Sequence, residues 1–226
     1  MYFCKMKREL ILTADGSKTI YIPEMDENYH STNGALQEAM HVFIQNGIRT
    51  LNPTAEITVF EMGFGTGLNA LLTLVDAVNS TRKINYIGIE AYPVELELIK
   101  EINYESLVNE QFTESFSSMH SLPWEQKHII HPNFTFQKIH AKIQNYQTLN
   151  SSVDIIFFDA FGPKVQQEVW TIDVLKKMYD MLKPNGILVT YCAMGQMKRD
   201  LKSLGFKVEG LPGPPGKREM TRAVKL

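Results

Sequence analysis

The pattern of apolar and polar positions along the chain changes near residue 53. Beyond that point, short apolar runs of strand length alternate with segments whose apolar residues recur at helical spacing. The apolar runs predict strands at 56–61, 84–90, 134–140, 153–159 and 187–191. The helical spacing predicts helices at 68–78, 93–102, 170–182 and 196–204, the third ended by residues 183–186. Such alternation is typical of an α/β fold with a mostly parallel sheet covered on both faces.

Two more apolar runs, at 206–211 and 220–224, predict the last strands of the chain. The connection between them contains Pro-Gly-Pro-Pro-Gly at 212–216, which is far too short for a crossover helix. We therefore expect these two strands to be antiparallel. With the five earlier strands they predict a Rossmann-like, seven-stranded, mostly parallel sheet with an antiparallel last strand.

The first 52 residues have a different pattern. Strand-forming residues on both sides of Asp15-Gly16 predict a β-hairpin over 9–22, and apolar residues at helical spacing predict a helix over 35–44 that stops at Gly47. We expect residues 1–52 to form a hairpin and helix extension packed on a catalytic domain of residues 53–226. The stretch 103–132 has no clear period, and we expect irregular helix and loop there.

Composition limits the class of protein. The chain has 226 residues, of which 44% are hydrophobic, and a net charge of -2. That content supports one sizeable core and excludes a disordered chain or a polybasic nucleic-acid coat, although a local basic patch can still bind RNA. Since no run of about 18 apolar residues is present and the start lacks the apolar core of a signal peptide, we expect a cytoplasmic protein.

Metal binding is not expected. Cys4 and Cys192 are the only cysteines, they lie far apart, and the six histidines show no spacing typical of metal ligands.

A glycine-rich turn after the strand at 56–61 is the sharpest local signal. Gly63, Gly65 and Gly67 alternate with other residues, which lets the backbone turn tightly and approach a ligand where the next helix begins. The spacing matches neither the dinucleotide-binding nor the P-loop pattern. Glu90 ends the next strand, where a carboxylate can accept hydrogen bonds from ribose hydroxyls. With Glu61 before the turn, this arrangement fits S-adenosylmethionine (SAM) better than NAD, although a plain strand–helix turn and a solvated acid remain alternatives.

A second acidic strand end carries the candidate chemistry. The apolar strand 153–159 delivers Asp159 to its carboxyl end, where open α/β sheets bind ligands. An alkylammonium group must lose a proton before it can attack a methyl donor, so a nearby carboxylate in a partly dry site suits N-methylation. Phe161 can stack on a base. The alternative is that Asp159 only caps the following turn.

The proline-rich connection near the end of the chain displays Lys217 and Arg218. A cationic loop beside a site suggests phosphate contacts. On composition alone, an ordinary solvated hairpin is the favoured interpretation.

Four stretches in this order resemble one known family. They are YHSTNGALQE at 29–38, EMGFGTGLN at 61–69, FDAFGP at 158–163 and GPPGKREM at 213–220. The combination resembles the MnmD-type tRNA methyltransferases, which are similar to the methyltransferase half of the bifunctional MnmC proteins. The resemblance runs from Tyr29 to Ala223.

The resemblance implies a class I SAM-dependent methyltransferase. The implied activity methylates the exocyclic amine of 5-aminomethyl-(2-thio)uridine at the wobble position of tRNA, giving the 5-methylaminomethyl form. The implied partner is the tRNA anticodon loop, with upstream tRNA-modifying enzymes supplying the substrate. Two-domain members of the family also carry a FAD-dependent oxidase domain, which we expect this chain to lack, so we expect no use of FAD.

The resemblance also implies roles for individual residues. Asp159 would sit at the acceptor amine as the catalytic residue. The implied SAM-binding residues are Tyr29, Ser31, Glu61, Gly63, Gly65, Gly67, Asn69 and Glu90. The implied RNA-contacting residues are Phe161, Lys217, Arg218 and Arg222. Glu38 belongs to the stretch that closes over the cofactor in the family.

One departure from the family and three alternatives stand beside this interpretation. In many relatives an acid after the third strand holds the adenine amino group, but this chain has Ile139-His140-Ala141, so the resemblance names no adenine contact. The alternatives are a SAM-dependent N-methyltransferase of a small-molecule or protein amine, an aminopropyl transferase, and a SAM-fold protein that only binds. The nearly neutral charge favours the first, and the single acid at 159 argues against the second.

Overall fold

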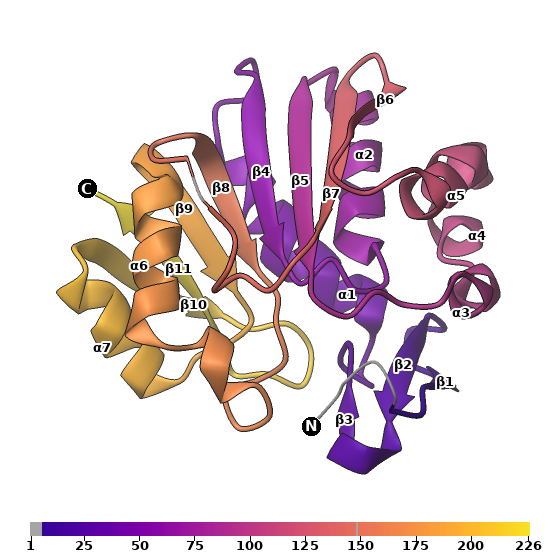
Figure 1. The fold of residues 1–226 in the computed structure, drawn as a ribbon, viewed down its shortest axis with the longest axis horizontal. Helices are drawn as coiled ribbons and strands as arrows, with labels where there is room; N and C mark the ends of the chain where they lie inside the picture. The colour runs from indigo at the N-terminus through magenta and orange to yellow at the C-terminus, as the bar shows by residue number, and fades with distance from the viewer. Residues whose placement is uncertain (1–5, 148) are drawn as a thin grey trace.

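An eight-stranded sheet forms the centre of the computed structural model, which describes residues 6–147 and 149–226 (Figure 1). In spatial order its strands are β10 (Phe206–Pro212), β11 (Glu219–Lys225), β9 (Leu182–Thr190), β8 (Val153–Phe158), β4 (Ile57–Met62), β5 (Ile84–Glu90), β7 (Phe134–His140) and β6 (Lys127–His131). The five strands from β9 to β7 are parallel. β11 is antiparallel to β9, β10 to β11, and β6 to β7.

One face of the sheet is covered by α1 (Ala35–Ala39) and α2 (Leu68–Ser80). Side chains of alternate strand residues, such as Val59 in β4 and Phe157 in β8, point to this face and join one apolar cluster with Leu71 and Leu74 of α2. Because successive strand residues point to opposite faces, strands that are apolar at every position can be buried on both sides.

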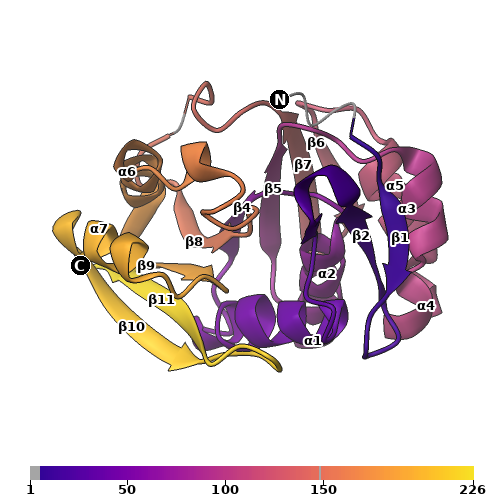
Figure 2. The ribbon, with the colours of Figure 1, turned by 90° about the horizontal axis from the view of Figure 1, so that it is seen from below.

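The opposite face is covered by α6 (Ile172–Met181) and α7 (Gly195–Ser203), which Figure 2 shows across the sheet from α2. The intervening strand residues, among them Phe60 in β4 and Phe158 in β8, form a second apolar cluster with Leu175 of α6 and Leu201 of α7. The two clusters confirm a sheet covered on both faces.

The N-terminal segment forms a small separate sheet of β1 (Glu9–Leu12), β2 (Lys18–Ile22) and β3 (Glu27–Asn28). The hairpin predicted over 9–22 is confirmed, since β1 and β2 are antiparallel. After α1 the chain continues as a π-helical segment, Met40–Gln45, whose Phe43 ring lies 5.0 Å from that of Phe157. The main apolar cluster therefore crosses residue 52, and the division of the chain at that point stays a prediction.

Most of the remaining helices come between β5 and β6 in the order of the chain. They are α3 (Leu96–Ile102), α4 (Glu105–Val108) and α5 (Thr113–Ser121), with short 3-10 segments at Pro23–Met25, Ile48–Thr50, Glu110–Phe112 and Gln167–Val169. Across residues 6–147 and 149–226, no helix combines the length and apolar character that a membrane crossing requires.

Three differences from the sequence analysis concern the central sheet and its helices, and a fourth is that the helix expected over 35–44 is α-helical only to Ala39. The sheet has one strand more than the seven predicted, because β6 lies in the stretch expected to be irregular; it is an edge strand with Ile129 80% exposed, so it lacks an apolar alternation. The helix predicted over 170–182 ends at Met181, and residues 183–186 belong to β9. The helix predicted from residue 93 begins at Leu96.

Candidate active site

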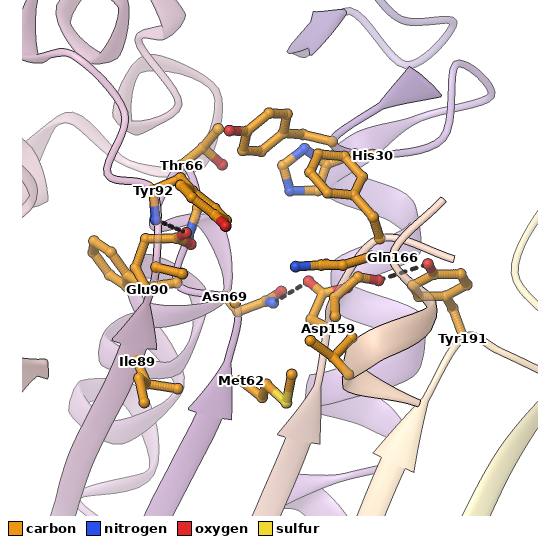
Figure 3. Close-up of a pocket in the computed structure, with 18 of the residues that line it drawn as sticks. His30, Met62, Thr66, Asn69, Ile89, Glu90, Tyr92, Asp159, Gln166 and Tyr191 are labelled. Atoms are coloured by element: carbon orange, nitrogen blue, oxygen red, sulfur yellow. Dashed lines mark hydrogen bonds between the residues drawn. The ribbon is translucent and has the colours of Figure 1, made fainter. Parts of the chain in front are cut away.

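A cavity of about 300 Å³ opens at the carboxyl ends of the central parallel strands (Figure 3). β4 lies between β5, the next strand in the chain, and β8, which comes much later. The chain order therefore changes direction at β4, and ligands of open α/β sheets bind outside the carboxyl ends of the strands at such a point. The cavity is also lined by residues of the N-terminal segment and by Lys217 of the loop between β10 and β11.

The predicted glycine turn follows β4. Gly63, Gly65 and Gly67 all have positive φ angles, of 92°, 50° and 75°. A Cβ atom on Gly63 would lie 2.1 Å from the backbone oxygen of Asp159, and one on Gly67 would lie 2.7 Å from Nε2 of His120. These two glycines are thus required by contacts within the protein. Gly63 and Gly65 line the cavity, whereas Gly67 caps the start of α2 and does not line it.

Replacing Gly63 with alanine is expected to displace the strand end that carries Asp159 and to destabilise the fold by about 2 kcal/mol, because the new methyl group meets backbone and the φ angle disfavours a side chain. Thermal unfolding measures the effect. Gly162→Ala is the matched control, since a Cβ there would come no closer than 3.8 Å to Tyr191 Oη. Equal melting temperatures for the two variants would contradict the expectation.

Glu90 lies at the end of β5, on one side of the cavity (Figure 3). Its Oε2 accepts a hydrogen bond from the backbone N–H of Gly65 at 2.9 Å, and its Oε1 accepts one from that of Tyr92 at 2.8 Å. The carboxylate therefore holds the glycine turn against the loop after β5. Each carboxylate oxygen can accept a second hydrogen bond, which leaves capacity for a ligand donor in the cavity.

Asn69, in the first turn of α2, links two carboxyl groups. Its Nδ2 donates to Oδ2 of Asp159 at 2.7 Å (Figure 3) and to Oε1 of Glu61 at 2.9 Å. Among the described residues, Oδ1 of Asn69 and Oε2 of Glu61 are buried without a hydrogen-bond partner. Asp159 and Asn69 line the cavity, while Glu61 lies behind Asn69 and is 1% exposed.

Burial shifts the pKa values of both carboxyl groups upward. It raises the pKa of Glu61 well above its usual range, and the contacts with Tyr86 and Asn69 only partly offset it. Burial raises the pKa of Asp159 to about 7, against the lowering effect of the Asn69 hydrogen bond. Asp159 is therefore poised to gain or lose a proton near neutral pH.

The N-terminal segment forms one wall of the cavity. Tyr29 and Ser31 both line it. The Tyr29 ring lies edge-on to Phe161, with ring centres 5.0 Å apart, and a Cβ atom on Gly65 would lie 3.3 Å from it. Arg8 donates hydrogen bonds to the backbone oxygens of Tyr92 and Pro93, which ties the N-terminal sheet to the loop after Glu90.

The three predicted RNA-contacting cations lie in different places. Lys217 lines the cavity and forms an ion pair with Glu38. Arg218 is exposed and does not line the cavity. Arg222, in β11, donates to Oε2 of Glu209 at 2.9 Å, and it does not line the cavity either. Phe161, the one aromatic residue predicted to contact RNA, is in the cavity wall.

Some lining residues were missed by the sequence analysis. Tyr191 follows β9, so the strand-end rule that identified Asp159 applies to it as well. The stretch Ala141–Gln144 follows β7 and lines the cavity, at the strand end where the sequence departs from the family pattern. His30 lines it too, and burial lowers the pKa of this histidine to about 4, so it is neutral.

No group of three His, Cys, Asp or Glu side chains within residues 6–147 and 149–226 is placed to hold a metal ion. Cys4 lies outside these residues, and Cys192 is buried.

Residues 100–226, just over half of the chain, match the model of a protein family described as S-adenosyl-L-methionine-dependent methyltransferase. The chain belongs to this family. The match confirms the predicted SAM-dependent methyltransferase class, and the arrangement of the central parallel strands confirms the predicted Rossmann-like sheet.

Relatives of this methyltransferase confirm the resemblance seen in the motifs. The bifunctional protein MnmC of Cupriavidus necator, named for tRNA 5-methylaminomethyl-2-thiouridine biosynthesis, is 28% identical over 95% of the chain and 34% of its own length. The MnmC of Leptospira interrogans is 30% identical over 93% of the chain and 34% of its own length. The chain thus spans about a third of these relatives.

Solved structures agree on the fold of the methyltransferase. MnmC2 of Aquifex aeolicus superposes with a TM-score of 0.73 at 24% identity and covers 97% of this chain and 70% of its own. Spermidine synthase of Thermotoga maritima superposes with a TM-score of 0.54 at 15% identity, over 98% of this chain and 75% of its own. Both likenesses concern the fold alone.

The cavity of the methyltransferase fits SAM. SAM carries hydrogen-bond donors at its ribose hydroxyls and at its methionine amino group. The cavity offers acceptors for such donors in the Glu90 carboxylate and in Oδ1 of Asn69, which is buried without a partner in the described part of the chain.

Proposed function

We propose that this methyltransferase transfers a methyl group from SAM to the exocyclic amine of 5-aminomethyl-(2-thio)uridine at the wobble position of tRNA, giving 5-methylaminomethyl-(2-thio)uridine. The MnmC relatives, which are named for this modification, align over nearly the whole chain. The observation that carries the proposal is the placement of Asp159 at the switch point of the sheet, in a cavity that also contains Phe161.

Asp159 suits an acceptor that is an alkylamine. Such an amine is protonated at neutral pH and cannot attack until it loses its proton. The carboxyl group has a pKa of about 7, so its ionised form can first pair with the ammonium group and then accept the proton. A ring nitrogen that already carries a free lone pair would not need an anion at this place.

The cofactor side of the cavity is assigned to the glycine turn and Glu90. When bound, SAM supplies a methyl group on a positively charged sulfur, already activated for transfer. Glu90 would accept hydrogen bonds from the ribose hydroxyls, and Asn69, with Glu61 behind it, would lie at the methionine end. Tyr29 and Ser31 would close the wall over the cofactor. The chain's contribution to the rate is to hold both reactants in line and to exclude water.

The nucleic-acid side is assigned to Phe161 and to the loop between β10 and β11. A wobble base sits in a loop, so it can leave its stack and rest against an aromatic side chain. Arg218 is exposed on the loop and is free to meet phosphate groups. Arg222 would need to leave Glu209 to do so. The supply of substrate by upstream enzymes, and the lack of a role for FAD, stay predictions.

Methyl transfer from labelled SAM tests the proposal. The acceptors are bulk tRNA from cells blocked at the aminomethyl-uridine stage and the same tRNA lacking that group, with mass analysis of the nucleosides. Label in the first pool alone, as methylaminomethyl uridine, is the expected result. Label in neither pool, with SAM binding intact, would reject the tRNA substrate and leave a small-molecule amine or aminopropyl transfer.

A further inference from the structure

Three distant parts of the chain meet at one corner of the cavity. Glu38 comes from α1, Lys217 from the loop between β10 and β11, and Tyr191 from the end of β9. The ammonium group of Lys217 forms an ion pair with Oε2 of Glu38 and lies 3.9 Å from the centre of the Tyr191 ring. The side chains of Glu38 and Lys217 are 9% and 31% exposed, so this pair belongs to the wall of the cavity.

The corner is fixed to the strand end that carries Asp159. The Tyr191 hydroxyl donates a hydrogen bond to the backbone oxygen of Ala160, the residue after Asp159, at 2.8 Å. Oε1 of Glu38 accepts a hydrogen bond from the backbone N–H of Ser31 at 3.2 Å. Tyr191 thus ties the cation to the strand end that carries Asp159, and Ser31 holds the anion in the wall of the same cavity.

A second set of contacts holds the loop itself. Nε2 of His41 and the backbone oxygen of Pro212 are 2.8 Å apart and hydrogen-bonded. A Cβ atom on Gly216 would lie 2.0 Å from the side chain of Asn33, so the loop packs closely on the N-terminal segment. Lys217 is thus presented to Glu38 by a docked loop and cannot reach a phosphate without leaving its partner.

We propose that Glu38 and Lys217 are positioning residues, a fixed ion pair that sets the charge around Asp159 and so controls its readiness to accept the proton of the acceptor amine. The proposal rests on the proposed function for the role of Asp159. It assigns Lys217 to the cavity wall, in place of the phosphate contact expected from the sequence.

Asp159 shares the cavity with other titratable groups, among them Glu27, Lys142 and Glu168. Burial raises the pKa values of Glu61, Tyr86, Tyr104, Tyr191 and Cys192 and lowers that of His30. Burial likewise raises the pKa of Tyr29. Glu90 is committed to the backbone of the glycine turn on the other side of Asn69.

The two members of the pair act on Asp159 in opposite directions. The negative charge of Glu38 raises the pKa of Asp159, and the positive charge of Lys217 lowers it. Removing one member therefore has the reverse effect of removing the other. A purely structural pair would behave differently, because loss of either member would loosen the same contact in the same way.

The test is a ¹³C NMR titration of the Asp159 carboxyl carbon in the full chain, with Asp159→Asn identifying the signal. We expect Glu38→Gln to lower the midpoint and Lys217→Met to raise it, each by roughly one pH unit, and the double variant to return close to the wild-type value. Lys217→Arg, which keeps the charge, is the matched control and should titrate like the wild type. Midpoint shifts of the same sign in both single variants, or no shift in either, would overturn the proposal.

This titration needs neither SAM nor tRNA. If tRNA methylation is absent but the midpoints move in opposite directions, the pair stands and only the substrate is wrong. If tRNA is methylated but the midpoints do not move, the pair has no control over Asp159 and the proposed function is untouched. Should Glu38→Gln fail to fold, the double variant Glu38→Asp, Lys217→Met takes its place. It keeps a negative charge at residue 38 while the cation is lost, so the proposal requires a raised midpoint for Asp159 in this variant.

Discussion

Replacement of Asp159 with asparagine is expected to lower the rate of methyl transfer by about 10²–10⁴-fold, the range typical of removing a general base. The affinity for SAM should stay nearly unchanged. Asparagine has the same shape, and its oxygen can still accept the hydrogen bond from Nδ2 of Asn69. It can neither attract an ammonium group nor accept a proton, so only the acceptor side of the reaction is affected.

Single-turnover kinetics and calorimetry with SAM measure the two effects separately. Asp173→Asn is the matched control, since this acid is exposed in the first turn of α6 and should leave both quantities unchanged. An Asp159→Asn variant that turns over at the wild-type rate would remove Asp159 from the mechanism. A large loss of SAM affinity would instead place it in the cofactor site.

The pH dependence follows from the same carboxyl group. Because the pKa of Asp159 is about 7 and the ionised form accepts the proton, kcat/KM should rise as the pH rises through about 7, and the Asp159→Asn variant should lack this step.

The free energy of unfolding should change with pH in the opposite direction to the activity. The folded-state pKa lies above the unfolded value of about 3.9, so ionisation costs stability progressively between about pH 4 and pH 7. The variant should therefore melt at a higher temperature than the wild type at pH 8, and not at pH 4. Equal melting temperatures at pH 8 would contradict the raised pKa.

The sequence was sufficient to predict the parts of the fold that have a strong local signal. β5, for example, is rich in apolar residues, and its predicted bounds agree with the structure. The edge strand β6 was missed because one face of it is open to solvent, so its histidines and lysine hide the strand period. The short β3 and the π-helical segment Met40–Gln45 depend on tertiary contacts and carry no periodic signal of their own.

The candidate site divides in the same way. Glu90 and Asp159 were identifiable because the carboxyl ends of parallel strands meet at one edge of the sheet. The pairing of Glu38 with Lys217 was not, because it joins α1 to the docked loop between β10 and β11, at opposite ends of the chain. The reason for Gly63 was also hidden: a glycine turn suggests close approach of a ligand, whereas here the neighbour that excludes a side chain is the Asp159 backbone.

Replacement of Glu90 with alanine is expected to weaken SAM binding by roughly 100-fold, which corresponds to the loss of one or two hydrogen bonds to a charged acceptor. Two losses combine. The ribose hydroxyls lose their acceptor, and the backbone N–H groups of Gly65 and Tyr92 lose the carboxylate that holds the glycine turn in place.

Calorimetry with SAM and, separately, binding of unmodified tRNA measure whether the loss at Glu90 is confined to the cofactor. The tRNA affinity should change little, because the Glu90 carboxylate is hydrogen-bonded to the glycine turn and to the loop after β5 and not to the loop that carries Lys217. Glu97→Ala, at an exposed acid in the first turn of α3, controls for loss of a negative charge near the same edge of the sheet.

Glu90→Gln separates the two roles. The amide oxygen of glutamine can accept a hydrogen bond from one of the two backbone N–H groups, but its NH2 group cannot accept one from the other. We expect it to bind SAM more tightly than Glu90→Ala and more weakly than the wild type. Wild-type SAM affinity in the alanine variant would exclude Glu90 from the cofactor site, and it would leave the carboxylate with only its backbone partners.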